Sequence, residues 1–233
     1  MKEIKILHLF PKLLSLYGEY GNVAVLRRAL EEAGHTVTVD GYENGELSLD
    51  GYHFIYAGSG TEDNLLEAIR RLLPHRQAIA ASIENGTLWL ATGNAMTLFG
   101  ASADGQEALG CFPYTTAIHG SKRYLGDVLT TDAFGAPFVG FINTSCVYEG
   151  ITAPLLTLQL GASLGNDKAI AADGIHVGNF YGTQLIGPVL VKNPHFLQHI
   201  CRKLTDEEIS LPADSYAQKA YDVALTELQK RLG

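Results

Sequence analysis

The sequence lacks the features of secreted, membrane-spanning and nucleic-acid-binding proteins. Its three cysteines, far apart and without a CxxC pair, indicate neither a disulfide framework nor a zinc site. No apolar run reaches the roughly 18 residues of a membrane span, and Pro11 interrupts the opening run too early for a signal peptide. The formal net charge is -8, with scattered Lys and Arg, which argues against binding to a phosphate backbone. We therefore expect a cytoplasmic protein with no membrane span and no nucleic-acid partner.

Metal-binding patterns are missing as well. The eight histidines share no ligand spacing. His195 and His199 lie four residues apart on an expected helix, but no third ligand accompanies them. Surface histidines are the favoured interpretation, and no metal or cofactor is expected.

Short apolar runs alternate with helical patterns in the first hundred residues. This order predicts crossover connections and a mostly parallel sheet. Thr61 opens one helix, and Gly34 ends the other. The expected strands are 4–10, 35–40, 53–58 and 88–92, and the expected helices are 22–34 and 61–73.

After residue 110 the pattern changes to shorter strand-like pieces, at 114–120, 124–130 and 136–143, followed by a hairpin within 174–187. Two helices close the chain, over 193–204 and 215–232. We expect one domain over residues 1–205. Residues 206–233 are expected to form a polar linker and a terminal helix that docks on the body or on a partner.

The stretch "LWLATGNAMTLFG", residues 88–100, has the layout of a nucleophile elbow, in which a strand turns sharply into a helix. Its tip is Gly93, which carries no side chain, and an amphipathic segment is expected from Met96. After the preceding strand, Gly58, Ser59 and Gly60 are placed to present backbone N–H groups to an oxyanion. A tight turn that binds nothing is the alternative interpretation.

These glycine-rich strand ends resemble class I glutamine amidotransferases of the cobyric-acid-synthase type, and most closely the GatD subunits of lipid II isoglutaminyl synthases. The resemblance spans nearly the whole chain, and "YGEYGN" and "GPVLVKNP" are its most specific motifs. It implies an α/β, flavodoxin-like three-layer fold with a mostly parallel central sheet. It also implies glutamine hydrolysis by a Cys nucleophile and a His base, with ammonia delivered to a synthetase partner.

Carried over position by position, the resemblance implies that this machinery is missing. The family's cysteine falls on Gly93 and its histidine on Ile186, while the "GFENH" motif becomes Gly140–Thr144 without its acid and histidine. The chain is thus predicted to be a degenerate, non-catalytic or regulatory partner of a Mur-ligase-like synthetase linked to cell-wall precursor amidation. A small molecule is expected in the vestigial pocket, which the resemblance places at Gly58, Ser59, Gly60, Gly93 and Asn94.

Other interpretations stay open at this stage. Arg123, with Lys122, is a candidate for meeting a carboxylate, although a solvated loop is the alternative. An active glutaminase with displaced residues would need Thr92 and a base such as His119 or His176.

Cys146 is better interpreted as a buried thiol than as a substitute nucleophile. A free-standing small-molecule binder would be disfavoured by a large exposed apolar patch on the terminal helix or on the "YGEYGN" turn.

Overall fold

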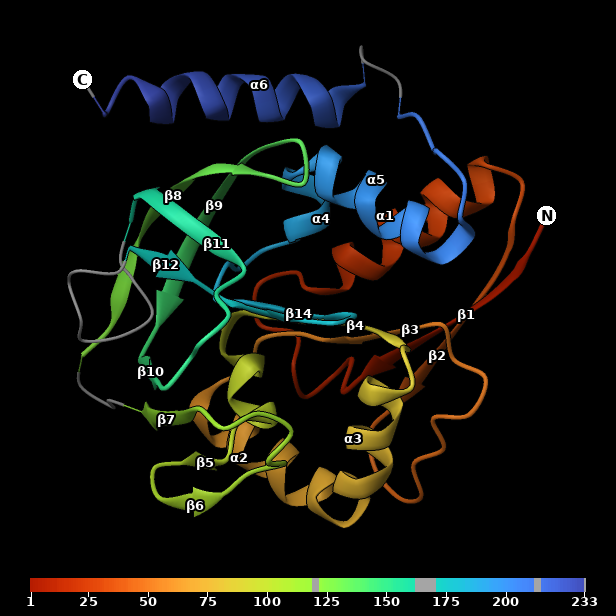
Figure 1. Cartoon of the computed structure of the whole chain (residues 1–233), viewed down its shortest axis with the longest axis vertical. Helices are drawn as coiled ribbons and strands as arrows, with labels where there is room; N and C mark the ends of the chain where they lie inside the picture. The colour runs from red at the N-terminus through yellow and green to blue at the C-terminus, as the bar shows by residue number, and fades with distance from the viewer. Residues whose placement is uncertain (119–121, 162–170, 212–214, 233) are drawn as a thin grey trace.

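A six-stranded sheet in the order β13-β14-β4-β3-β1-β2 forms the centre of the computed structural model, which describes residues 1–118, 122–161, 171–211 and 215–232 (Figure 1). All neighbouring strands are parallel except β13 and β14, which pair as an antiparallel hairpin. The predicted mostly parallel sheet and late hairpin are therefore confirmed. The strands are β1 (Glu3–Leu9), β2 (Thr36–Tyr42), β3 (Phe54–Ala57), β4 (Leu88–Thr92), β13 (Ile175–Val177) and β14 (Phe180–Thr183).

Helices cover both faces of this sheet, and the alternation of side chains along each strand builds two cores. Phe54 and Tyr56 of β3 point into one core, whereas Ile55 and Ala57 point into the other. The first core also contains the buried faces of α1 (Tyr20–Glu32), α4 (Val189–Lys192) and α5 (Pro194–Thr205). The second contains those of α2 (Glu62–Leu72), α3 (Arg76–Glu84) and the 3-10 helix η2 (Gly93–Phe99). The result is the expected three-layer arrangement.

Local signals explain where the early helices begin and end. The Thr61 side chain accepts a hydrogen bond from the Asn64 amide and caps α2. After α1, Gly34 has a φ of +88°, a conformation that glycine adopts without strain. Helix α3, which follows the short 3-10 helix η1 (Leu73–His75), was not predicted from the sequence. Its nine residues bury only Ile79 and Ser82, so its apolar pattern is too sparse to show helical periodicity.

The second half of the chain adds two smaller sheets beside the central one. Both have four strands, one in the order β12-β11-β8-β9 and the other in the order β10-β7-β5-β6. Their strands are β5 (Ser102–Ala103), β6 (Gln106–Glu107), β7 (Thr115–Ile118), β8 (Tyr124–Ala133), β9 (Ala136–Thr144), β10 (Cys146–Glu149), β11 (Leu156–Leu160) and β12 (Ala172–Asp173).

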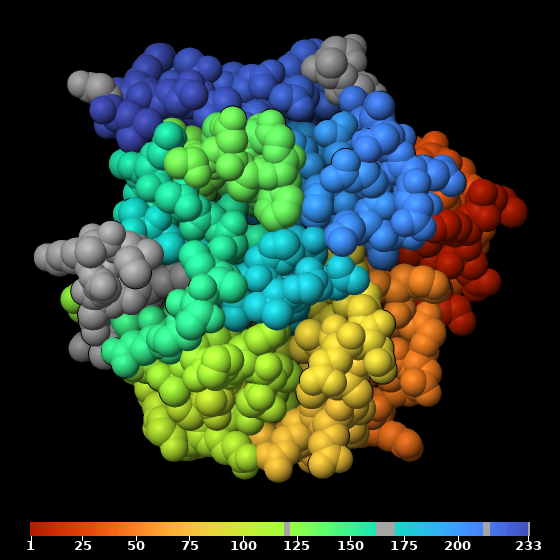
Figure 2. All heavy atoms as spheres, viewed as in Figure 1, coloured from red at the N-terminus to blue at the C-terminus, as the bar shows by residue number. Residues whose placement is uncertain are grey.

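The last helix, α6 (Tyr216–Gln229), lies as a ridge along one end of the molecule, against β8, β9, α4 and α5 (Figures 1 and 2). Tyr221 and Leu228 are its buried side chains, and the Tyr221 hydroxyl donates to the Pro137 carbonyl over 2.8 Å. The division into residues 1–205 and 206–233 stays a prediction, although α5 does end at Thr205. None of the helices in the described ranges is long and apolar enough to cross a bilayer.

The expectation of surface histidines is wrong for several of them. His8 and His35 are each 5% exposed. His199 packs on Phe134 at 4.4 Å between ring centroids, and His195 packs on Phe138 at 4.9 Å. These rings fill apolar layers as aromatic side chains do, which a search for metal spacing does not detect.

Candidate functional site

The carboxyl end of β4 makes the sharp turn that the sequence predicts. Gly93 has a φ of +60°, in the left-handed region that side-chain-bearing residues rarely adopt. Its amide donates to the Leu185 carbonyl over 3.1 Å, which ties the turn to the segment after β14. The helix that follows is a 3-10 helix whose seven residues are all buried. The predicted amphipathic segment from Met96 is therefore wrong, because β5 and β9 pack around this helix as well.

Positions 93 and 186, which the resemblance assigns to nucleophile and base, lie next to each other. A Cβ built on Gly93 would be 3.0 Å from Ile186 Cγ2 and only 1.8 Å from the Ser59 hydroxyl oxygen. Ser59 is 1% exposed, and its hydroxyl donates to the Thr92 carbonyl over 3.4 Å. The space that a side chain at position 93 would need is thus already filled by Ser59.

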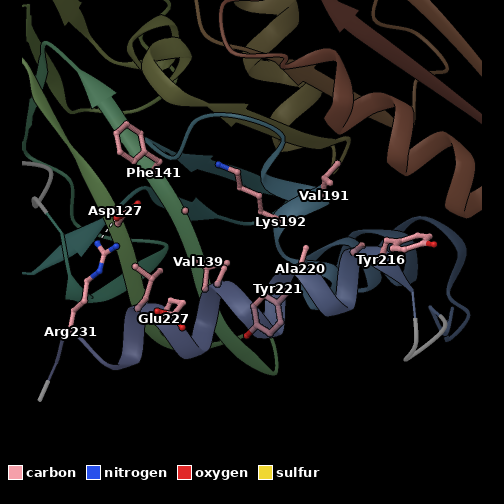
Figure 3. A pocket seen from close by; sticks show the side chains of 14 residues that line it. Asp127, Val139, Phe141, Val191, Lys192, Tyr216, Ala220, Tyr221, Glu227 and Arg231 are labelled. Atoms are coloured by element: carbon pink, nitrogen blue, oxygen red, sulfur yellow. Dashed lines mark hydrogen bonds and ion pairs between the residues drawn. The ribbon is translucent and has the colours of Figure 1, made fainter.

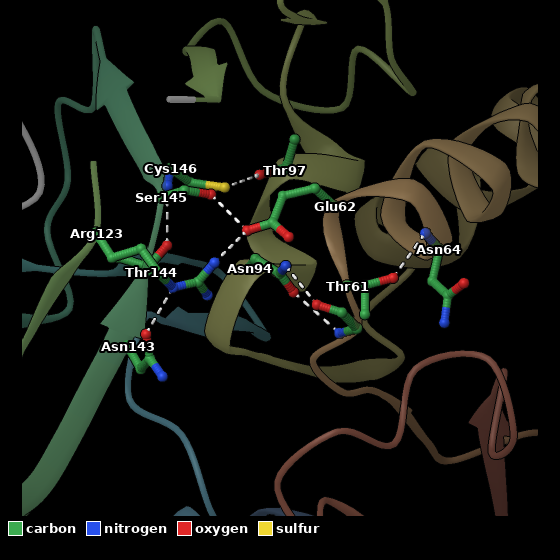
Figure 4. Close-up of polar contacts among 11 residues, drawn as sticks. Thr61, Glu62, Asn64, Asn94, Thr97, Arg123, Asn143, Thr144, Ser145 and Cys146 are labelled. Atoms are coloured by element: carbon green, nitrogen blue, oxygen red, sulfur yellow. Dashed lines mark hydrogen bonds and ion pairs between the residues drawn. The ribbon is translucent and has the colours of Figure 1, made fainter. Parts of the chain in front are cut away.

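The predicted glycine loop is packed from both sides. A Cβ on Gly58 would lie 2.7 Å from Glu19 Cβ, and one on Gly60 would lie 2.6 Å from Leu14 Cδ2. The Gly60 amide donates to Asn94 Oδ1 over 3.1 Å, and Asn94 Nδ2 donates back to the Gly60 carbonyl over 2.8 Å (Figure 4). The glycines therefore permit close approach of the loop between β1 and α1, which contains Leu14 and Glu19. Asn94 already accepts a hydrogen bond from the Gly60 amide, one of the N–H groups expected to face an oxyanion.

Arg123 reaches a carboxylate, and that carboxylate belongs to the protein itself. Its guanidinium donates to Glu62 Oε1 over 2.8 Å and to Asn143 Oδ1 over 2.9 Å, while Ser145 Oγ donates to the same Glu62 oxygen over 2.7 Å (Figure 4). The Ser145 hydrogen bond, with smaller contributions from a backbone hydrogen bond and from Arg123, outweighs burial and holds the pKa of Glu62 below its usual range. Lys122 instead places its amine 4.9 Å from the centre of the Tyr124 ring.

A buried polar cluster beneath the elbow was not predicted. The Glu19 carboxylate is 0% exposed. One of its oxygens accepts from the Tyr56 hydroxyl over 2.6 Å and from the Thr92 hydroxyl over 2.8 Å. Burial, and next the neighbouring Glu19 charge, raises the pKa of Tyr56 well above its ordinary value. Glu19 belongs to "YGEYGN", and its position as an acid inside that motif was the signal from which this cluster could have been predicted.

The alternative catalytic residues do not gather around Thr92. His176 stacks on Tyr181 at 4.4 Å, whereas Thr92 pairs with Thr183, two residues further along β14. His119 lies outside the described residues.

Cys146 is 2% exposed, and burial raises the pKa of its thiol, so the interpretation as a buried thiol is confirmed. Within the described ranges, no group of three His, Cys, Asp or Glu residues is arranged to hold a metal ion.

Comparison with known proteins shows which proteins this chain is similar to. No family model matches the sequence. The lipid II isoglutaminyl synthase (glutamine-hydrolyzing) subunit GatD of Streptococcus pneumoniae is 26% identical over 228 residues, covering 91% of this chain and 85% of that protein. The GatD subunit of Staphylococcus aureus is 27% identical over 215 residues, covering 89% and 87%. The chain is GatD-like.

Solved structures agree with this similarity at the level of the fold. A glutamine amidotransferase crystal structure superposes on the GatD-like chain with a TM-score of 0.56 at 14% identity, covering 85% of this chain and 98% of that one. A chain of PurLQS from Thermotoga maritima gives 0.51 at 14% identity, covering 97% and 99%. The predicted glutamine-amidotransferase-like fold is therefore confirmed.

Proposed function

We propose that the GatD-like chain is a glutamine-amidotransferase-type subunit without glutaminase activity. In this proposal it is a non-catalytic or regulatory partner of a Mur-ligase-like synthetase that amidates a cell-wall precursor. The observation that carries the proposal is that Gly93, after β4, lies next to Ile186, after β14. A Cβ built on Gly93 would be 3.0 Å from Ile186 Cγ2. That proximity supports assigning the two positions to the nucleophile and base of the cobyric-acid-synthase type.

The chemistry of a Cys-His glutaminase has no substitute at these positions. Acyl transfer needs a thiolate and a base within hydrogen-bonding reach. Glycine has no side chain to form a thioester, and isoleucine cannot accept a proton. Loss of either member of such a pair removes most of the rate, and the Ser59 hydroxyl further fills the space beside Gly93.

The alternative, an active glutaminase with displaced residues, has one observation in its favour. The Thr92 hydroxyl donates to the Glu19 carboxylate over 2.8 Å, so a hydroxyl and a base are in contact. Both residues are 0% exposed, however, and a nucleophile has to be reached by its substrate. The non-catalytic function is therefore the better supported of the two.

Glutamine hydrolysis by the purified chain tests the proposal. We expect no ammonia release above a heat-killed control, with or without the Mur-ligase-like protein encoded nearest to its gene. Release by the wild type would overturn the non-catalytic proposal and direct attention to Thr92 and Glu19.

The structure also determines which variant should be used to rebuild the activity. Gly93→Cys alone places its Cβ on the Ser59 hydroxyl and is expected to be inactive. Ser59→Gly/Gly93→Cys/Ile186→His removes that clash and supplies both catalytic groups. Turnover by this triple variant, absent from Ser59→Gly/Gly93→Cys, would show that the amidotransferase frame is retained.

Single exposed apolar side chains lie on α6 and beside the "YGEYGN" turn, the two places where a partner would be expected to dock. Tyr216 and Val223 on α6 are 92% and 65% exposed, and Leu16 and Tyr20 at the "YGEYGN" turn are 46% and 65% exposed. Co-purification with the neighbouring Mur-ligase-like protein tests this part of the proposal. A chain that elutes alone at micromolar concentrations of both proteins would contradict it.

A further inference from the structure

An open groove lies between α6 and the sheet edge formed by β9, and neither Gly93 nor Ile186 is among its lining residues. Its volume is about 540 Å³, within the range of small-molecule sites. Val139 and Phe141 line the side formed by β9, and on α6 the small residues Ala217, Ala220 and Ala224 leave the opposite side open (Figure 3).

Among the described residues, one charged group in this groove has no ion-pair partner. Asp127 pairs with Arg231, and Glu227 pairs with Lys230. Lys192, at the end of α4, forms no ion pair with any described carboxylate. Glu19 and Asp127 act on it only from longer range.

Lys192 is one of the residues that line the groove. It donates to the Ile186 carbonyl over 3.3 Å, a weak contact for an ammonium group. Burial lowers the pKa of Lys192, because the charged form loses part of its hydration. A partly dehydrated ammonium without a counter-charge is stabilised by an anion that brings its own charge.

Shape and charge together define the ligand. Most of the groove is lined by apolar side chains, so the ligand needs an apolar body. A single ammonium matches a single negative charge, and the groove's other cation, Arg231, is already paired. We propose that the groove binds an apolar carboxylic acid, with its carboxylate at Lys192 and its apolar body between β9 and α6.

Binding of decanoate, measured by isothermal titration calorimetry below its micelle concentration, tests this proposal on the full chain. Decan-1-ol has the same chain without the charge. We expect one molar equivalent of decanoate to bind, and decan-1-ol to bind at least about tenfold more weakly. Lys192→Met, which keeps the apolar stem, should reduce the decanoate affinity to that of decan-1-ol.

Two further variants locate the site. Ala220→Trp should abolish binding by filling the groove from its α6 side. Lys219→Met removes the same charge from the exposed side of α6, outside the groove, and should leave the decanoate affinity unchanged. Thermal melts of each variant check that it is folded.

Several outcomes would overturn the proposal: no decanoate binding, equal affinities for decanoate and decan-1-ol, or full decanoate affinity in Lys192→Met. Equal weakening by Lys219→Met and Lys192→Met would also overturn it, because it would show only an effect of net charge. None of these measurements depends on glutaminase activity, so the groove proposal and the proposed function fail or succeed separately.

Discussion

The elbow at the end of β4 is tightly packed, whereas the groove beside α6 is open, and Ile186 contacts residues of both. At the elbow, the Ile186 side chain and the Ser59 hydroxyl close in on Gly93, so that even a single Cβ has no room. On the groove side, the Ile186 carbonyl accepts from Lys192, and small side chains leave an open volume. A substitution at the elbow should therefore act through overpacking, whereas one in the groove should be tolerated by the fold.

The largest expected effect comes from adding one carbon at the elbow. Gly93→Ala should lower the free energy of unfolding by about 2–4 kcal/mol, because overpacking adds to the strain of a left-handed backbone. In a Ser59→Gly background the same change should cost only about 1–2 kcal/mol, because the left-handed backbone and the close contact with Ile186 Cγ2 remain. Urea unfolding of the four proteins in this cycle measures the difference.

Gly18→Ala is the matched control, since Gly18 has a φ of +74° with nothing within 4 Å of an added Cβ. It should cost about 1 kcal/mol. If Gly93→Ala proved no more costly than Gly18→Ala, the filled-elbow interpretation would be wrong.

The next effect concerns the buried carboxylate beneath the elbow. Glu19→Ala removes the acceptor of the Tyr56 and Thr92 hydroxyls and should cost about 2–3 kcal/mol, because buried donors then lose a charged partner. Glu31→Ala, which breaks the exposed pair with Arg27, should cost only about 0.5 kcal/mol. Chemical denaturation distinguishes the two, and equal losses would show that the Glu19 cluster adds no stability.

A smaller effect depends on pH and is confined to the α6 side. Burial lowers the pKa of His195 to about 4 from 6.5, so its folded form binds fewer protons than its unfolded form between these values. The stability it contributes is complete above pH 6.5 and is lost as the pH falls towards 4. Between pH 6.5 and pH 5, His195→Phe should reduce this acid sensitivity by about 1–2 kcal/mol.

Stability measured for wild type and His195→Phe across this pH range gives the difference directly. Comparison of the two proteins is needed because burial also lowers the pKa values of His8 and His199 to about 4. Burial raises the pKa of Asp173 to about 6, which acts in the opposite sense. Identical pH dependence in the two proteins would exclude His195 as a contributor.

The smallest effect is expected at the Arg123–Glu62 ion pair. Both side chains are partly exposed, at 40% and 31%, so Arg123→Met should cost less than about 1 kcal/mol. The loss should shrink further at high salt. A loss comparable to that of Glu19→Ala would show that this pair is a structural element and would weaken the case for a solvent-accessible site there.

The sequence predicts those parts of the fold that are governed by local rules. The break after Thr92 predicts the turn at Gly93, and Thr61 predicts the start of α2, because neighbours along the chain decide both features. The position of Ser59 beside Gly93 depends on the parallel pairing and the register of β3 and β4. Hydrophobic periodicity does not reveal that register. Glu62 and Arg123 are 61 residues apart in sequence, and Glu62 also fits the role of an ordinary first-turn acid.

The environment of the histidines likewise depends on tertiary packing and could not be predicted from the sequence. His195 has the spacing of a metal ligand or of a surface residue, yet it packs between Phe138 and Tyr221, from β9 and α6. That environment exists only after α6 has packed against β8 and β9. Spacing within one helix therefore carries no information about it.

The Ser59 hydroxyl lies beside Gly93, and we propose that it is not activated as a nucleophile, because it donates to the Thr92 carbonyl rather than to a base. Intact mass spectrometry after incubation with an electrophilic glutamine analogue tests this claim most directly, with Ser59→Gly/Gly93→Cys/Ile186→His as the positive control. We predict no mass increase in the wild type and one adduct, mapped to position 93, in the triple variant. A wild-type adduct mapped to Ser59 or Thr92 would contradict the account.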